Sequence, residues 1–281
     1  MYPIKKVMAI HDISCYGRAS LTTIIPTLSI MGVQVCPLPT AILSTHTGGY
    51  GKPEQVDLSN FIDNAKNHWK ELNLEFDCIY TGYLSNSSQV KLIKNIIKDF
   101  KSRNKLVVID PVMADEGKLY SNIGVDMVEA MRDLILQADI ITPNITEAAF
   151  LLGRDYNDIF DFEEVDIWAI KLADLGIDNV IITSVPSKKG INYIDTISYD
   201  RKTEKLMRIS VEKVNKYYPG TGDFFASILI GEILNGTNIQ EAAKRASEFI
   251  GLSIAESAKY DYNSKEGILL EKVLPKLLKK Y

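Results

Sequence analysis

Short, strongly apolar runs alternate with longer amphipathic stretches along most of this 281-residue chain. Apolar runs without polar alternation are typical of strands that are buried on both faces of a parallel sheet. The alternation therefore predicts an α/β fold, a three-layer α/β/α sandwich with a central, mostly parallel sheet. The runs expected to form buried strands are 7–10, 33–37, 78–82, 106–110, 139–143 and 180–183.

The longer stretches repeat apolar residues at three-to-four spacing, which predicts amphipathic helices. In the segment 87–100, for example, Val90, Ile93 and Ile97 share one side of the helical wheel. After residue 183 the pattern changes to alternation of polar and apolar residues in 190–200 and 205–214, which predicts an antiparallel hairpin at the sheet edge. The expected helices are 87–100, 121–137, 161–175, 221–234 and 238–258.

Composition narrows the class of protein. The length suits a single α/β domain over residues 1–281, and 46% hydrophobic with 24% charged residues is ordinary for a globular protein. A net charge of -4 provides no basic face for nucleic acid. The first residues contain too few apolar positions for a signal peptide or a membrane helix, so we expect a cytoplasmic protein.

The cysteines and histidines are too scattered to indicate a disulfide framework or a zinc site. We expect the three cysteines, Cys15 among them, to be small buried side chains. His46 is interpreted as a loop histidine with satisfied hydrogen bonds, without a catalytic role.

The segment Gly220–Asp223 carries the strongest chemical signal. Gly220 and Gly222 flank Thr221 at the start of an apolar helical run, so backbone N–H groups can converge at the positive end of a helix and bind a phosphate. Asp223 in the first turn would be kept ionised by the helix dipole and could accept a proton. A simple turn followed by a helix-capping aspartate would produce the same four residues.

Two further polar segments follow predicted strands, at the sheet edge where ligands bind in open α/β folds. Asp110 and Asp115 follow one strand, and their carboxylates suit magnesium, although Asp110 could simply cap a turn. Asn144 and Glu147 follow the next strand and could hold phosphate and a hydrated metal. Asn144 could equally begin a helix whose capping box is completed by Glu147.

The nucleotide-binding motifs of several other classes are absent from the sequence. It contains neither a Gly-x-x-x-x-Gly-Lys-Ser/Thr loop nor a strand-linked Gly-x-Gly-x-x-Gly, and it has no Gly-x-Ser-x-Gly elbow. P-loop kinases, Rossmann dehydrogenases and hydrolases of that type are therefore disfavoured.

In order along the chain stand Asp-Pro-Val-Met at 110–113, Thr-Pro-Asn-x-x-Glu at 142–147, Ile-Ile-Thr-Ser at 181–184 and Gly-Thr-Gly-Asp at 220–223. This set resembles the ribokinase-like superfamily and, within it, the pyridoxal kinases, over roughly residues 5–255. The resemblance implies that Gly220, Thr221 and Gly222 form an anion hole and that Asp223 is the catalytic base. The positions that it implies for nucleotide or metal binding are Asp110, Asp115, Thr142, Asn144, Glu147, Thr183, Ser184, Val214, Asn215, Lys216 and Thr221.

The resemblance also implies a substrate side, formed by the loops that contain Asp12, Thr47 and Tyr83, together with Asp223. Tyr83 could stack on a pyridine ring, and Asp12 could pair with a protonated nitrogen. Asp12 could instead cap the following helix. Asp12 stands where many relatives carry Ser, and the chain reads Ser-Thr-His-Thr where others read Ser-Asn-His-Thr, so the preferred vitamer stays open.

The function that the resemblance implies is transfer of the ATP γ-phosphoryl group to the 5′-hydroxymethyl of pyridoxal, pyridoxine or pyridoxamine, in vitamin B6 salvage. It also implies Mg²⁺ near Asp115, Thr142 and Glu147, a monovalent cation, K⁺ or Na⁺, near Thr142, and a homodimer. Two alternatives stay open: a hydroxymethylpyrimidine kinase of the same superfamily, and a non-catalytic B6-binding protein.

Overall fold

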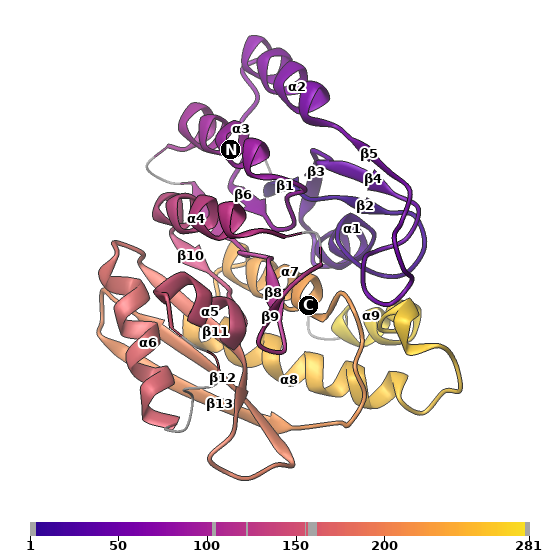
Figure 1. The fold of residues 1–281 in the computed structure, drawn as a ribbon, viewed down its shortest axis with the longest axis vertical. Coiled ribbons are helices and arrows are strands. Elements are labelled where there is room, and N and C mark those ends of the chain that lie inside the picture. The colour runs from indigo at the N-terminus through magenta and orange to yellow at the C-terminus, as the bar shows by residue number, and fades with distance from the viewer. Residues whose placement is uncertain (1–3, 103–104, 122, 155, 157–161, 279–281) are drawn as a thin grey trace.

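The computed structural model describes residues 4–102, 105–121, 123–154, 156 and 162–278. The strands of its main sheet are β1 (Lys6–Ile10), β3 (Gln34–Pro37), β6 (Cys78–Thr81), β7 (Leu106–Ile109), β10 (Ile140–Ile141), β11 (Asn179–Pro186), β12 (Tyr193–Asp200) and β13 (Lys205–Glu212). Within the described residues these eight strands lie in the order β13-β12-β11-β10-β7-β6-β1-β3. All pairs from β3 to β11 are parallel, whereas β12 and β13 form an antiparallel hairpin at the edge, as predicted (Figure 1).

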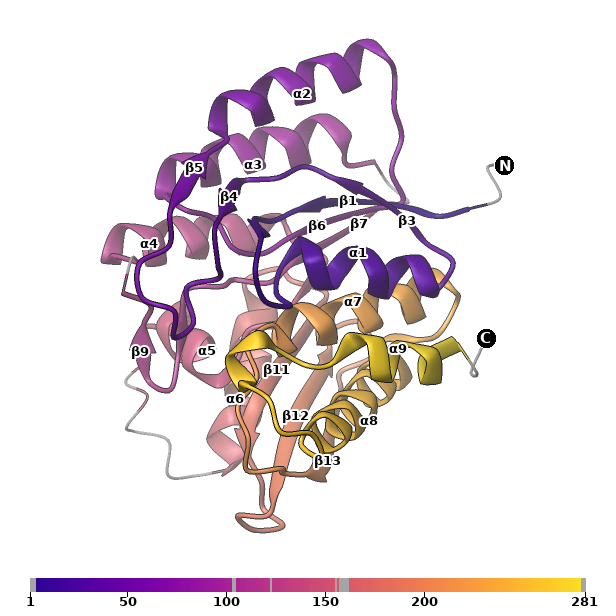
Figure 2. The same cartoon turned by 90° about the vertical axis from the view of Figure 1, so that its right-hand side faces the viewer.

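Helices cover both faces of this sheet (Figures 1 and 2). They are α1 (Leu21–Ile30), α2 (Ser59–Glu71), α3 (Ser87–Phe100), α4 (Val125–Leu134), α5 (Ile145–Leu152), α6 (Phe162–Asp174), α7 (Thr221–Leu234), α8 (Ile239–Ser257) and α9 (Leu270–Leu278), with short 3-10 helices η1 (Ile135–Gln137) and η3 (Ser264–Glu266). The second to sixth helices contribute to one hydrophobic core, and α1, α7, α8 and α9 contribute to the other. The three-layer arrangement is thereby confirmed.

Strand β1 illustrates why the buried strands read as continuous apolar runs. Val7 and Ala9 face the core under α1 and α7, whereas Met8 and Ile10 face the opposite core. Successive side chains of a strand point to opposite faces, so a strand covered on both sides needs apolar residues at every position.

Two small sheets lie beside the carboxyl ends of the central strands. One consists of β2 (Ile13–Ser14), β4 (Ala41–Leu43) and β5 (Gln55–Asp57), and the other of β8 (Ala114–Asp115) and β9 (Lys118–Leu119). The first begins shortly after β1, and the second begins shortly after β7. Both therefore build up the edge at which open α/β sheets bind ligands.

Several predicted elements differ from those observed. The strand expected at 33–37 is β3, which is partly exposed because it is the last strand of the sheet, so the prediction of burial on both faces was wrong there. The helix expected at 121–137 begins at Val125 and ends in the 3-10 turn η1. Residues 122 and 161, which we assigned to helices, lie outside the described residues.

The sequence analysis did not assign α1 or α2 to helices. Helix α1 contains Pro26 and is apolar around most of its circumference, so a three-to-four repeat is hard to see. Helix α2 is the opposite case, since Ile62 is its one fully buried residue among those described. A helix that buries so little has only a weak periodic signal.

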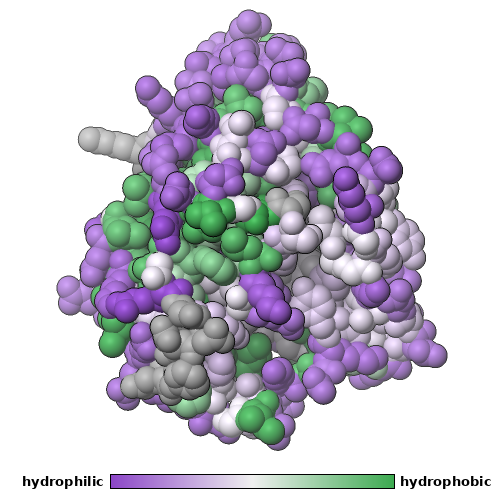
Figure 3. Space-filling model, viewed as in Figure 1, coloured by the Kyte–Doolittle hydropathy of each residue, from purple (hydrophilic) through white to green (hydrophobic). Residues whose placement is uncertain are grey.

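The surface seen in Figure 3 is largely hydrophilic, with hydrophobic side chains gathered near the middle of this face. No helix in the described part of the chain is both long and apolar enough to cross a membrane. The expectation that all three cysteines are buried was wrong, because Cys15 is exposed next to β2 while Cys78 is buried in β6.

Candidate active site

The segment Gly220–Asp223 forms the first turn of α7. Gly220 precedes the helix with a φ of 79°, and a Cβ at this position would lie 2.2 Å from the backbone oxygen of Arg18. Only glycine adopts this left-handed conformation without strain and fits so close to another backbone segment. The first N–H groups of the helix are left without partners inside the helix, which makes this turn suitable for binding an anion.

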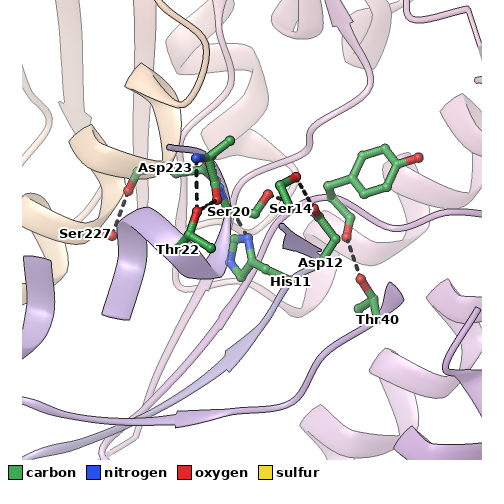
Figure 4. Close-up of polar contacts among 10 residues, drawn as sticks. His11, Asp12, Ser14, Ser20, Thr22, Thr40, Asp223 and Ser227 are labelled. Carbon is green, nitrogen blue, oxygen red and sulfur yellow. Dashed lines mark hydrogen bonds and ion pairs between the residues drawn. The ribbon is translucent and has the colours of Figure 1, made fainter. Parts of the chain in front are cut away.

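Asp223 is the carboxylate of this turn, and its two oxygens have different surroundings (Figure 4). Oδ2 accepts a 2.8 Å hydrogen bond from the backbone N–H of Ser20, whereas Oδ1 lies 3.7 Å from Nδ1 of His11. Burial, together with the charge of Asp12, raises the pKa of Asp223 to about 7, although the Ser20 hydrogen bond opposes this. The expectation that the helix dipole keeps this carboxylate firmly ionised is therefore corrected, because burial dominates.

A second group of oxygen atoms lies at the ends of β7 and β10. The side chains of Asp110, Thr142 and Glu147 are all buried there. Burial and the charge of Asp223 raise the pKa of Asp110, and burial and the charge of Asp110 raise that of Glu147. The Thr142 side chain interacts with the Asp110 carboxyl group, which partly opposes the rise in the pKa of Asp110. A bound cation would relieve this concentration of buried carboxylates.

Asn144 and Glu147 form the capping box that the sequence left open as an alternative. The Asn144 side chain accepts from the Glu147 N–H at 2.9 Å, and Glu147 Oε2 accepts from the Asn144 N–H at 2.9 Å. The same side chains also hold the loop after β7, since Asn144 donates to the Ala114 carbonyl and Met113 N–H donates to Glu147 Oε1. Both residues thus fix the shape of this edge and also face the cavity described below.

The predicted substrate residues meet in a small cavity of about 120 Å³. Asp12, Thr47, Tyr83 and Asp223 all line it, although they come from four separate parts of the chain. Asp12 accepts hydrogen bonds from the hydroxyl groups of Ser14 and Ser20 (Figure 4). Its side chain therefore braces the cavity wall. It does not cap α1, because no side-chain hydrogen bond caps this helix, whose N-cap residue is Ser20.

The loop that carries Thr47 is fastened to the C-terminal part of the chain. Nε2 of His46 lies 2.6 Å from the Lys265 carbonyl oxygen, and its Nδ1 accepts a hydrogen bond from the Gly48 N–H. The Lys265 ammonium in turn donates to the Gly49 carbonyl. His46 is thus the satisfied loop histidine that we expected.

A second cavity, of about 570 Å³, is also lined by Asp223. All the positions predicted for nucleotide or metal line it, namely Asp110, Asp115, Thr142, Asn144, Glu147, Thr183, Ser184, Val214, Asn215, Lys216 and Thr221. Its wall also includes the apolar residues Phe225, Ile250 and Ile254, which the sequence analysis did not single out. A polar end and an apolar wall suit a ligand with a charged part and a flat ring.

The two cavities share part of their lining, and Asp223 and Gly220 lie in the shared part. Ser20, Tyr120 and Tyr217 lie there too, although the sequence analysis missed them. No feature of the sequence marks Ser20 as a site residue. In the structure, its backbone has a φ of 52° and its N–H points toward Asp223. The geometry thus places one carboxylate in the wall of both cavities.

A model of the phosphomethylpyrimidine kinase family matches residues 15–268. Human pyridoxal kinase is 30% identical over 220 residues, which cover 72% of this chain and 69% of the human protein. The chain belongs to the pyridoxal kinase family. The resemblance inferred from the four ordered motifs is confirmed, and with it the prediction of a phosphotransferase.

Solved structures agree with this assignment across nearly the whole chain. Pyridoxal kinase from Lactobacillus plantarum is 31% identical with a TM-score of 0.89, covering 98% of this chain and 97% of that one. A protein from Bacteroides thetaiotaomicron VPI-5482, provisionally assigned as a phosphomethylpyrimidine kinase and crystallised with pyridoxal, is 43% identical. Its TM-score is 0.93, with 98% of this chain and 96% of that one covered. The ribokinase-like α/β fold is thus shared.

Proposed function

We propose that this chain transfers the γ-phosphoryl group of ATP to the 5′-hydroxymethyl group of a vitamin B6 vitamer, giving ADP and the 5′-phosphate in B6 salvage. The observation that carries the proposal is the position of Asp223 where the two cavities meet. The smaller cavity would hold the vitamer beside Asp12, Thr47 and Tyr83. The larger one would hold ATP.

The chemistry follows from this placement. Asp223 would accept the proton of the substrate alcohol as its oxygen attacks the γ-phosphorus and the bond to the β-phosphate oxygen breaks. The N–H groups of Gly220, Thr221 and Gly222 would stabilise the negative charge on the transferred group. A base whose pKa lies near neutrality suits this task, since it is largely free to accept a proton yet still basic enough to do so.

The larger cavity provides groups for each part of the nucleotide. We propose that Asn144, Thr183 and Ser184 contact the phosphates, with Asp110 beside them, and that Val214, Asn215 and Lys216 border the adenine. Thr183 is held in place by its N–H, which donates to the Pro143 carbonyl at 2.9 Å.

The oxygen groups near the phosphate end fit a divalent cation. Magnesium prefers oxygen ligands and binds through one or two carboxylates together with substrate phosphates, so a cluster of three acidic residues is not needed. Among the described residues no such cluster of three or more His, Cys, Asp or Glu exists. We propose that Asp115, Thr142 and Glu147 hold Mg²⁺, directly or through water, with K⁺ or Na⁺ near Thr142. When bound, magnesium would neutralise charge on the triphosphate.

Asp115→Asn is expected to raise the Mg²⁺ concentration needed for half-maximal activity by about tenfold, the effect of one lost charged contact of roughly 1.4 kcal/mol. The reason is that Asp115 is a partly exposed carboxylate in the cavity wall, bonded to the Glu116 N–H. A magnesium titration at saturating ATP measures this half-maximal Mg²⁺ concentration. Asp174→Asn, at an exposed position of α6, is the matched control. Equal titration curves for the two variants would remove Asp115 from the metal site.

Activity should depend on pH through Asp223. Below its pKa of about 7 the carboxyl group is protonated and cannot accept the substrate proton, so kcat/KM should fall by about tenfold for each further pH unit. Above that pKa the group is ionised and kcat/KM should level off. The measurement is kcat/KM for the vitamer across this range, and a profile that stays flat down to the usual carboxyl range would contradict the role of burial.

The family model and the Bacteroides relative both carry the phosphomethylpyrimidine kinase description, so hydroxymethylpyrimidine is the second candidate acceptor. Pyridoxal in the crystal structure of that relative favours a vitamer. A coupled assay of ADP release with the three B6 vitamers, hydroxymethylpyrimidine and ribose tests the proposal. Faster turnover of hydroxymethylpyrimidine would replace it, and vitamer binding without ATP consumption would support the non-catalytic alternative.

We further propose that the protein is cytoplasmic and forms a homodimer.

A further inference from the structure

His11 is a buried polar side chain beside the site. It follows β1 directly, is completely buried, and neither of its ring nitrogens has a hydrogen-bond partner among the described residues. Its ring packs against Tyr80, with ring centroids 4.3 Å apart. A Cβ at Gly82 would lie 2.4 Å from the imidazole, so the glycine leaves the ring just enough room. Buried donors without partners are rare and call for a functional explanation.

The unpartnered ring lies beside Asp223 (Figure 4). Nδ1 of His11 is 3.7 Å from Oδ1 of Asp223, slightly too far for a hydrogen bond. The other oxygen, Oδ2, already accepts from the Ser20 N–H at 2.8 Å. The Asp223 carboxylate thus already accepts a hydrogen bond from Ser20, and only a small movement would bring His11 Nδ1 within hydrogen-bonding distance of its other oxygen.

We infer that His11 is a positioning residue for Asp223: its Nδ1–H donates to Oδ1 when both substrates are bound, and with Ser20 it fixes the plane of the carboxylate. Catalytic hydrogen bonds are often long in free enzymes and tighten in the substrate complex. The inference rests on the proposed kinase function.

The surroundings determine how His11 can act. The titratable groups that face this pair are Asp12, Asp110 and the Tyr80 hydroxyl, so no cation lies among them in the described residues. Burial lowers the pKa of His11 to about 3, so its imidazole is neutral and has one N–H. Because the Asp223 carboxylate next to Nδ1 is a hydrogen-bond acceptor, it favours the tautomer that carries the proton on Nδ1. A hydrogen bond from His11 favours the ionised form of Asp223 and so opposes the rise in the pKa of Asp223 that burial causes.

The test compares His11→Leu with His11→Asn, two side chains of the same branching and similar size. Asparagine can keep an N–H donor near the Nδ1 position, whereas leucine cannot. We expect His11→Leu to lower kcat about 10- to 100-fold, the size of a hydrogen bond to a charged group, with KM for vitamer and ATP little changed. The acid limb of its pH profile should move to higher pH. His11→Asn should keep both kcat and the acid limb of the pH profile closer to those of the wild type.

A double variant separates this role from general packing. If His11 acts through Asp223, adding His11→Leu to Asp223→Asn should cost little further activity, because the group it positions is already gone. Gly82→Ala provides an independent test if His11→Leu folds poorly, since it displaces the ring without removing it and should also lower kcat.

Equal losses in the leucine and asparagine variants, or a full additional loss in the double variant, would overturn the inference. Wild-type kcat in His11→Leu would do the same. In each of these cases wild-type phosphorylation of a vitamer would leave the proposed function intact. Absence of phosphorylation by the wild-type protein would instead refute the proposed function itself.

Discussion

Asp223→Asn is expected to lower kcat by about 10²- to 10⁴-fold, the usual contribution of a general base. Asparagine keeps the size of the side chain and can still accept from the Ser20 N–H, but it cannot take the alcohol proton. KM values for ATP and vitamer should change little, because the remaining lining of both cavities is untouched. Steady-state kinetics with purified protein measures the effect.

The same substitution should not weaken the fold. Burial raises the pKa of Asp223 above its unfolded value, so ionising it at neutral pH disfavours the folded state. That penalty is absent at pH below the unfolded carboxyl pKa and develops as the pH rises toward 7. Removing the ionisable group should therefore leave thermal stability at neutral pH equal to or above that of the wild type. Near-normal turnover would exclude Asp223 as the base, and a lowered melting temperature would indicate that activity was lost through unfolding.

Gly220→Ala should abolish most activity and destabilise the protein. The left-handed backbone at Gly220 costs an alanine roughly 1–2 kcal/mol. The added Cβ would also lie 2.2 Å from the Arg18 carbonyl oxygen, which belongs to the backbone and cannot rotate away. Relief requires a shift of the first turn of α7 or of the segment before Ser20, and either shift moves the N–H groups or the donor to Asp223.

Gly222→Ala is the matched control in the same turn. Its φ is not in the left-handed region, and the nearest described atom to its Cβ would be Asp110 Oδ2, at an ordinary 3.7 Å. We expect its free energy of unfolding to stay close to that of the wild type. Denaturant unfolding of both variants measures the difference, and equal stabilities would show that the contact between Gly220 and Arg18 relaxes easily.

The sequence allowed the layers of the fold to be predicted because burial on both faces leaves a pattern that does not depend on distant residues. The strand at 78–82 and the helix at 87–100 correspond closely to β6 and α3. Helix α1 and the sheet of β2, β4 and β5 were not predicted. Strands of two or three residues are too short for a periodic signal, and α1 has no polar side from which its period can be recognised.

The candidate site could be predicted where a family pattern, alone or together with local chemistry, points to particular residues. The residues of 110–115, 142–147 and 220–223 could be named because each motif follows a strand or begins a helix. Ser20, Tyr120 and Tyr217 could not be named, since no local pattern in the sequence indicates that they line both cavities.

The sequence by itself determined the α/β class and the family, and it singled out Gly220–Asp223 as a candidate anion site, because these depend on residue types at short spacing. The tertiary structure alone decided that Asp223 lines both cavities and that burial brings its pKa to about 7. It also decided that His11, more than 200 positions away, stands 3.7 Å from its carboxylate. Desolvation and the distance between remote side chains depend on how the chain packs, and no local pattern encodes them.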